Sequence, residues 1–71
     1  MALEVYGPML RDRRRELGLR QEELAELAGV STRFIGELEA GKETARLDKF
    51  HDVLDALGLT ITISVRSPLS K

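Results

Sequence analysis

The 71-residue chain is long enough for one small domain and only marginally large enough to bury a hydrophobic core alone. Hydrophobic residues make up 42% and charged residues 32%, which is typical of an ordered, soluble protein rather than a disordered tail. The lack of cysteine excludes disulfides and thiolate metal sites. No apolar run approaches the ~20 residues of a membrane span, and the N-terminus lacks a signal-peptide pattern, so we expect a cytoplasmic protein with no membrane partner.

The first helix is predicted to begin at Gly7 or Pro8 and to end at Leu17. Proline suits the first turn of a helix, and Gly18 follows as a natural end. Most of the apolar side of this helix is expected to come from Met9, Leu10 and Leu17. Residues 1–6 form a separate N-terminal segment, in which the apolar residues alternate with more polar ones and are compatible with extended structure.

Two short helical patterns follow, at residues 21–28 and 32–40. Between them, Gly29 suits a helix end at positive φ, Val30 is an apolar turn residue, and Ser31 is a good N-cap. Ala25 is small where two helices that cross steeply must approach closely. This arrangement predicts a helix-turn-helix, whose second helix lies in the major groove of DNA and presents its first side chains to base edges.

The last predicted helix covers residues 47–57 and ends at Gly58. Its helical spacing of apolar residues is carried by Leu47, Phe50, Val53, Leu54 and Leu57. Residues 60–66 then alternate polar and apolar side chains, which predicts a half-buried β-strand, and residues 67–71 are expected to be a flexible tail.

A single strand in a helical chain needs a partner, because an unpaired apolar strand is prone to aggregation. We expect residues 60–66 to pair with the same strand of a second copy, with Ile61, Ile63 and Val65 covering the helices of both subunits. The alternative is a hairpin within one chain, between residues 2–6 and 60–66.

The net charge of −1 argues weakly against a nucleic-acid partner, but the charges are unevenly distributed. Arginines cluster near the start of the chain, further basic residues recur near helix ends, and acidic residues lie along the second and fourth helices. This pattern fits a polar molecule with one basic face. It also fits charges that only solvate helix surfaces.

Residues 7–59, about three-quarters of the chain, resemble the Cro/phage-repressor (Xre-type) helix-turn-helix family. The resemblance is carried by Leu10, Arg14, Gly18-Leu19, Gln21-Glu22-Glu23-Leu24-Ala25, Ala28-Gly29-Val30-Ser31, Ile35, Leu38-Glu39, Gly41-Lys42 and Leu57-Gly58-Leu59. It implies a mainly α fold, a lambda-repressor-like helix-turn-helix bundle of about four to five helices with one C-terminal β-strand that pairs across a dimer. The strand after Leu57-Gly58-Leu59 is similar to that of HipB-type antitoxins, which bind operator DNA and a HipA-type kinase toxin.

The resemblance implies a division of labour among the polar residues. Base edges would be contacted from the start of the recognition helix by Ser31, Thr32, Arg33, Gly36 and Glu37. For Glu37 a solvated or locally paired acid is the favoured alternative, because a carboxylate repels phosphate and could accept only from a cytosine amino group. Phosphates would be contacted by Arg11, Arg20, Gln21, Lys42 and Arg46. Arg14 and Glu39 are expected to form a partly buried salt bridge that joins the first helix to the recognition helix.

Two positions depart from the family pattern, which usually has Ser or Thr as the N-cap before the second and fourth helices. This chain has Arg20 and Arg46 there. Loss of an N-cap costs about 1 kcal/mol, and a cation at a helix N-terminus is mildly unfavourable. We interpret both arginines as an exchange of helix capping for phosphate binding.

We expect no enzymatic activity, no cofactor and no metal. His51 is the single histidine, and no motif spacing gives it catalytic partners. An acidic row such as Asp48, Asp52 and Asp55 is more often a solvated helix face than a metal site.

The stronger rival to DNA binding is a protein-interaction module that docks a partner through Glu22, Glu23, Glu26, Asp52 and Asp55. A stand-alone regulator without a toxin is the third possibility. The expected partners are therefore a palindromic DNA operator, a second copy of the chain and a HipA-like kinase toxin.

Overall fold

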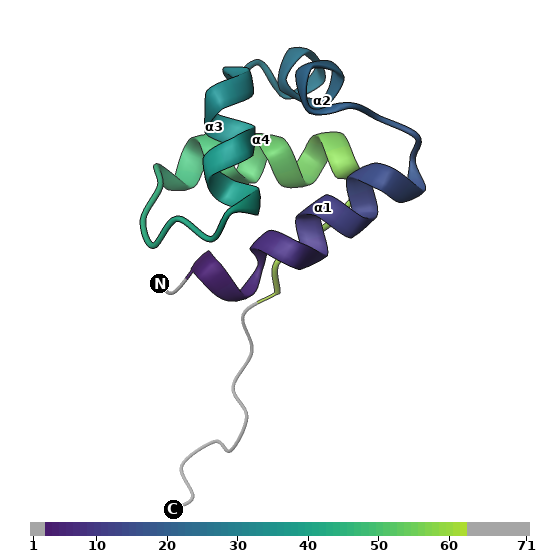
Figure 1. Cartoon of the computed structure of the whole chain (residues 1–71). Coiled ribbons are helices and arrows are strands. Elements are labelled where there is room, and N and C mark those ends of the chain that lie inside the picture. The colour runs from purple at the N-terminus through teal and green to yellow at the C-terminus, as the bar shows by residue number, and fades with distance from the viewer. Residues whose placement is uncertain (1–2, 63–71) are drawn as a thin grey trace, which may run out of the picture.

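The computed structural model describes residues 3–62 and consists of short helices, the last two of which are joined by a longer loop at residues 40–46 (Figure 1). A 3₁₀ turn, η1 (Leu3–Val5), precedes α1 (Gly7–Glu16), α2 (Gln21–Ala28), α3 (Thr32–Glu39) and α4 (Leu47–Leu57). The predicted helix-turn-helix bundle is confirmed. The ends of α1 and α3 differ from the prediction by one residue, because Leu17 and Ala40 are the C-caps of these helices.

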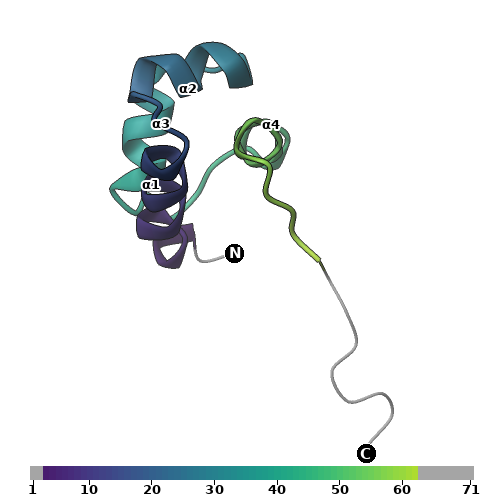
Figure 2. The same cartoon turned by 90° about the vertical axis from the view of Figure 1, so that its right-hand side faces the viewer.

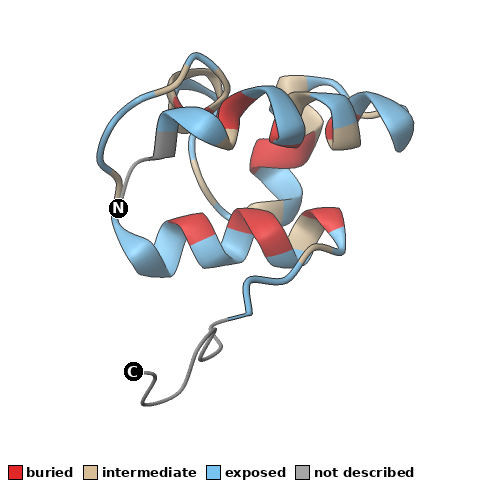
Figure 3. Cartoon of the chain, turned by 90° about the horizontal axis from the view of Figure 1, so that it is seen from below, coloured by how far each residue is buried: buried red, intermediate tan, exposed pale blue. Residues whose placement is uncertain are grey.

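The core lies where α4 packs against the other helices. Viewed along the axis of α4, the helices α1, α2 and α3 lie to one side of it (Figure 2). Buried segments of the helices face one another in the middle of the molecule (Figure 3). The buried hydrophobic side chains are Leu10, Leu24, Ala25, Ile35, Leu38, Phe50, Val53, Leu54 and Leu57. Every α-helix contributes to this set, so the domain has a single shared core.

The joint between α2 and α3 has the predicted local chemistry. Gly29 ends α2 in the left-handed region, with φ of 72°, which a residue with a side chain adopts only at a cost. The Ser31 hydroxyl accepts a hydrogen bond of 3.0 Å from the backbone N–H of Phe34, which caps α3. Ala25 is 3% exposed, and Val30 packs against the core. The joint therefore fixes the orientation of α3 relative to α2.

A second close approach, between α1 and α3, depends on Gly7. A Cβ atom at this buried position would lie 2.6 Å from the carbonyl oxygen of Glu39 and 2.9 Å from that of Leu38. The start of α1 therefore touches the backbone at the end of α3, and only glycine fits between them without a shift.

Several details of the sequence interpretation are wrong. Residues 3–5 form a 3₁₀ turn rather than extended structure. Met9 is 58% exposed and Leu17 is 43% exposed, because α1 turns Gly7, Leu10 and Arg14 toward the core and leaves other positions outside. Leu47 is 67% exposed, because it lies in the first turn of α4, before this helix reaches the core.

Most of the predicted strand at residues 60–66 lies outside the described residues, and so do Ile63 and Val65. Residues 59–62 have no regular secondary structure, and Ile61 is 46% exposed. The hairpin alternative requires an extended segment at residues 2–6, which the helical turn at Leu3–Val5 contradicts. Within residues 3–62, no helix has the length and apolarity needed to cross a membrane.

Candidate nucleic-acid interface

The N-terminal end of α3 is open to solvent. Ser31, Thr32 and Arg33 are all exposed, and the Arg33 side chain retains 87% of its accessible surface. One turn later, a Cβ atom at Gly36 would meet only the Gln21 side-chain oxygen, 3.9 Å away, so the surface there is bare. The structure thus brings the predicted base-contacting residues together on an accessible helix start.

Glu37 is the acidic member of this group, and it pairs locally. Its Oε2 atom accepts a hydrogen bond of 3.2 Å from Arg33 Nε, and its Oε1 atom accepts one of 3.2 Å from Lys42 Nζ. The hydrogen bond from Lys42, helped by Arg33, holds the pKa of Glu37 below its ordinary value. This carboxylate is therefore ionised at neutral pH and joins a predicted base reader to a predicted phosphate contact.

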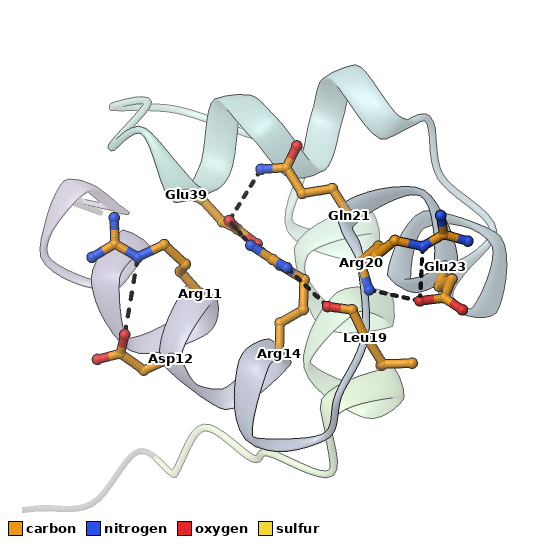
Figure 4. Close-up of polar contacts among 8 residues, drawn as sticks. All are labelled: Arg11, Asp12, Arg14, Leu19, Arg20, Gln21, Glu23 and Glu39. Atoms are coloured by element: carbon orange, nitrogen blue, oxygen red, sulfur yellow. Dashed lines mark hydrogen bonds and ion pairs between the residues drawn. The ribbon is translucent and has the colours of Figure 1, made fainter.

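A buried ion pair joins Arg14 on α1 to Glu39 on α3 (Figure 4). Arg14 Nε donates to Glu39 Oε2 over 2.6 Å, and Arg14 Nη2 donates to Oε1 over 2.9 Å. The third donor of this guanidinium, Nη1, reaches the Leu19 carbonyl at 2.8 Å. The two side chains are 10% and 6% exposed. Two parallel hydrogen bonds between largely buried side chains hold α1 against α3.

Gln21 belongs to the same network, because its amide nitrogen donates to Glu39 Oε1 over 3.1 Å. Burial alone would raise the pKa of Glu39, but hydrogen bonds from Arg14 and Gln21 and the charges of Arg14 and Arg11 hold this pKa below its ordinary value. The predicted phosphate contact at the start of α2 is therefore linked by its side chain to the end of α3.

Arg20 and Arg46 precede α2 and α4 as N-caps, and neither side chain caps its helix. At α2, the Glu23 carboxylate accepts a hydrogen bond of 2.8 Å from the backbone N–H of Arg20, which is one half of a capping box. That bond lowers the pKa of Glu23. At α4, the Arg46 guanidinium donates two hydrogen bonds to Asp48, of 3.1 and 2.7 Å. Both arginines remain largely exposed.

Arg11 lies on α1 beside this network (Figure 4). Its Nε atom is 3.9 Å from a carboxylate oxygen of Asp12 and is buried, with no hydrogen-bond partner within the described part of the chain. The side chain as a whole is 43% exposed. Arg11 is therefore a partly exposed cation whose charge also acts on the nearby Glu39.

Comparison with known proteins agrees with this geometry. Residues 10–63 match the family described as helix-turn-helix. An uncharacterized HTH-type transcriptional regulator, y4mF of Sinorhizobium fredii, is 53% identical over 57 residues, which cover 80% of this chain and 75% of that protein. The chain belongs to the helix-turn-helix family of DNA-binding transcriptional regulators.

Two solved structures share the helix-turn-helix fold. The restriction-modification controller protein C.AhdI from Aeromonas hydrophila is 33% identical with a TM-score of 0.74, and the match covers 82% of this chain and 88% of that one. A chain of the HipA-HipB-O2-O3 complex has a TM-score of 0.80 with 93% of each chain covered, and at 23% identity it shows the fold alone. Proteins of the helix-turn-helix family bind DNA by placing a recognition helix in the major groove.

Some contacts in this helix-turn-helix domain are not evident from the sequence. Arg13 Nε donates a hydrogen bond of 2.9 Å to the carbonyl of Leu57, at the C-terminal end of α4. A cation there is favourable for the helix dipole. The two residues are 44 positions apart, so no local pattern indicates this contact. For Glu23, in contrast, an acidic residue three positions after the N-cap is a recognisable signal.

One histidine and two aspartates on α4 form an exposed group. His51 Nδ1 lies 3.5 Å from Asp55, and the ligand atoms of His51, Asp52 and Asp55 lie within 4.8 Å of one another. All three side chains are exposed to solvent. Such a group is common on a solvated helix face and indicates neither a metal site nor a catalytic site by itself.

Proposed function

We propose that this protein is a sequence-specific transcriptional repressor that binds a palindromic operator as a homodimer. The observation that carries the proposal is the exposed start of α3, where Ser31, Thr32 and Arg33 face solvent on a rigid joint. Arginine forms two hydrogen bonds with the O6 and N7 atoms of guanine, and threonine contacts the thymine methyl group. We assign base reading to these residues, with Gly36 and Glu37 one turn further along.

Phosphate binding is assigned to residues that surround α3. These are Arg11, Arg20, Gln21, Lys42 and Arg46, each of which has exposed or partly exposed surface. In the free protein most of these residues form surface ion pairs with Asp or Glu side chains of the same chain. Such ion pairs are weak, so another anion can readily take the place of the carboxylate. Phosphate oxygens replace those carboxylates without any change in the fold.

Dimerisation is supported by an apolar surface on α4. A groove of about 500 Å³ there is lined by Leu47, Phe50, Leu54 and Ile61, together with acidic residues and His51. We propose that a second copy covers this groove, because Ile61, which belongs to the predicted strand at residues 60–66, is one of its lining residues. Pairing of the two strands would set the two recognition helices about 34 Å apart, one turn of DNA.

An antitoxin role is the finer proposal. It is supported by the sequence resemblance of the C-terminal strand to HipB-type antitoxins and by the shared fold with a chain of the HipA-HipB-O2-O3 complex. The protein would then repress its own operon and bind a HipA-like kinase toxin. The 33% identity to the controller protein C.AhdI supports the alternative of a regulator that works without a toxin.

Titration of DNA from the upstream region of the gene, followed by gel shift at several salt concentrations, tests the repressor. A dimer with about six to ten phosphate contacts should lose about 10³- to 10⁵-fold in affinity from roughly 50 to 200 mM salt. No binding to any upstream fragment at low salt would contradict it and would favour the interaction module on the acidic faces of α2 and α4.

The dimer and the toxin need separate measurements. Ile63→Pro removes a ladder donor and an apolar side chain, so it should yield monomers with much weaker operator binding. Sedimentation of the unmodified protein as a monomer at micromolar concentration would refute the dimer. Co-purification with the product of a neighbouring kinase-like gene would support the antitoxin, and the absence of such a gene would support the stand-alone regulator.

A further inference from the structure

Glu37 occupies the centre of the recognition surface, and its two cationic partners lie further out. The Glu37 side chain is 34% exposed, compared with 46% for Lys42 and 87% for Arg33. Arg33 lies four residues earlier on the same face of α3, where side chains are neighbours. The two cations are therefore freer than the carboxylate to turn toward another acceptor.

DNA binding through this surface separates the carboxylate from its partners. Lys42 must exchange Glu37 for a phosphate, and Arg33 must exchange it for a base edge or a phosphate. Glu37 is then left ionised beside the phosphate backbone, which is unfavourable unless the DNA offers a donor. In the major groove the available donors are the amino groups on N4 of cytosine and N6 of adenine.

We propose that Glu37 is a specificity-determining residue that selects against DNA lacking an amino donor opposite it. On a matching site, the cytosine or adenine amino group replaces the cations that Glu37 gives up. On other DNA, Arg33 and Lys42 either remain bound to Glu37 and make weak contacts, or leave the carboxylate unpaired. This inference rests on the proposed function. It adds an interaction that is unfavourable on the wrong DNA sequence to the favourable base and phosphate contacts assigned above.

The salt dependence of binding should report this exchange. In the unmodified protein on non-specific DNA, Lys42 that stays bound to Glu37 neutralises no phosphate. With Glu37→Gln, Lys42 is free to neutralise one phosphate and release its counterion. On non-specific DNA, the slope of log affinity against log salt should therefore become steeper by about one unit, since each neutralised phosphate contributes about 0.9.

The test compares Glu37→Gln with Glu26→Gln, which makes the same charge change at an exposed position near the other end of α2. The probes are a duplex selected from a random library by the unmodified protein and a shuffled duplex of the same composition. Glu37→Gln should bind the shuffled duplex about tenfold more tightly, with the steeper slope, while its preference for the selected duplex falls by a similar factor. Glu26→Gln should keep the preference and raise both affinities only slightly.

Equal shifts on both duplexes, matching those of Glu26→Gln, would overturn the inference and leave the repressor proposal standing. Failure of the unmodified protein to enrich any duplex would instead contradict the repressor. A circular dichroism melting curve shows whether Glu37→Gln is folded. If it is not, Glu37→Ala replaces it, and the inference predicts the same tighter binding of the shuffled duplex and the same loss of preference for the selected duplex.

Discussion

Glu37 and Glu39 lie two residues apart at the end of the recognition helix, and they hold arginines in opposite settings. The side chain of Glu39 is 6% exposed and accepts two hydrogen bonds from Arg14, whose side chain is 10% exposed. The side chain of Glu37 is 34% exposed and holds Arg33, which is 87% exposed, through one. The same pair of residue types therefore joins helices in one place and forms an exchangeable surface contact in the other.

The difference follows from the helical period. Residues two positions apart point about 200° away from each other around an α-helix, so one faces α1 and the other faces solvent. A buried pair is costly to break because it strands a desolvated charge. An exposed pair is easily replaced by water, salt or phosphate. Position on the helix, rather than residue type, decides which pair stabilises the domain and which remains available for DNA.

The largest expected effect is on stability. Glu39→Ala leaves the Arg14 guanidinium buried without its carboxylate and should lower the free energy of unfolding by about 3 kcal/mol. Glu37→Ala should lower it far less, because Arg33 and Lys42 both reach water. Urea denaturation of the two variants measures the difference. Equal losses would mean that the burial of Glu39 has no energetic consequence.

The second prediction divides the DNA contacts. Arg33→Ala should cost about 1 to 3 kcal/mol of operator binding and relax the preference at one base pair, because a bidentate contact to guanine is lost. Lys42→Ala should weaken binding to all sequences alike, because a phosphate carries no sequence information. Binding to a set of single-base operator variants distinguishes them. A uniform loss for both substitutions would show that Arg33 does not read a base.

The sequence was sufficient for those parts of the fold that depend on local rules. Gly29 and Ser31 predicted the joint, because a left-handed C-cap and a side-chain N-cap depend only on neighbouring residues. The pairing of Arg14 with Glu39 was implied by resemblance to a family, not by any local rule. In the structure these two side chains form a bidentate ion pair.

The contacts that were missed depend on how the helices cross. Gly7 fits against the Glu39 carbonyl only because α1 meets α3 at that point, and Arg13 reaches Leu57 only because α1 passes the end of α4. Leu47 matches the apolar spacing of α4 and is nevertheless exposed, since spacing identifies a face but not how far along the helix the core extends.

A third prediction concerns the exposed arginines at the starts of α2 and α4, which we place in the same exchangeable class as Arg33. Arg20→Ser adds a side-chain cap opposite the existing Glu23 contact and should stabilise the free protein by about 1 kcal/mol. Arg46→Ser should act similarly at α4. Both should weaken DNA binding. A melting temperature that rises together with the affinity for DNA would contradict the exchange of capping for phosphate binding.

The smallest expected effect is on the pH dependence of stability. The pKa of Glu39 is lowered in the folded protein, since hydrogen bonds and charge from its partners outweigh burial. A carboxyl group whose pKa is lower in the folded than in the unfolded chain stabilises the fold at pH values above its unfolded pKa. This contribution is lost as the pH falls through the pKa of that group in the folded protein. Glu39→Gln should therefore flatten the loss of stability below about pH 4.5, the ordinary pKa of a glutamate. Thermal melts between about pH 3 and 7 measure this slope, with the exposed Glu26→Gln as the control.

Because burial opposes the other causes at Glu39, the flattening should be modest. A slope identical to that of the control would show that Glu39 has the same pKa in the folded and unfolded chains. The buried ion pair would then not lower the pKa of its carboxylate.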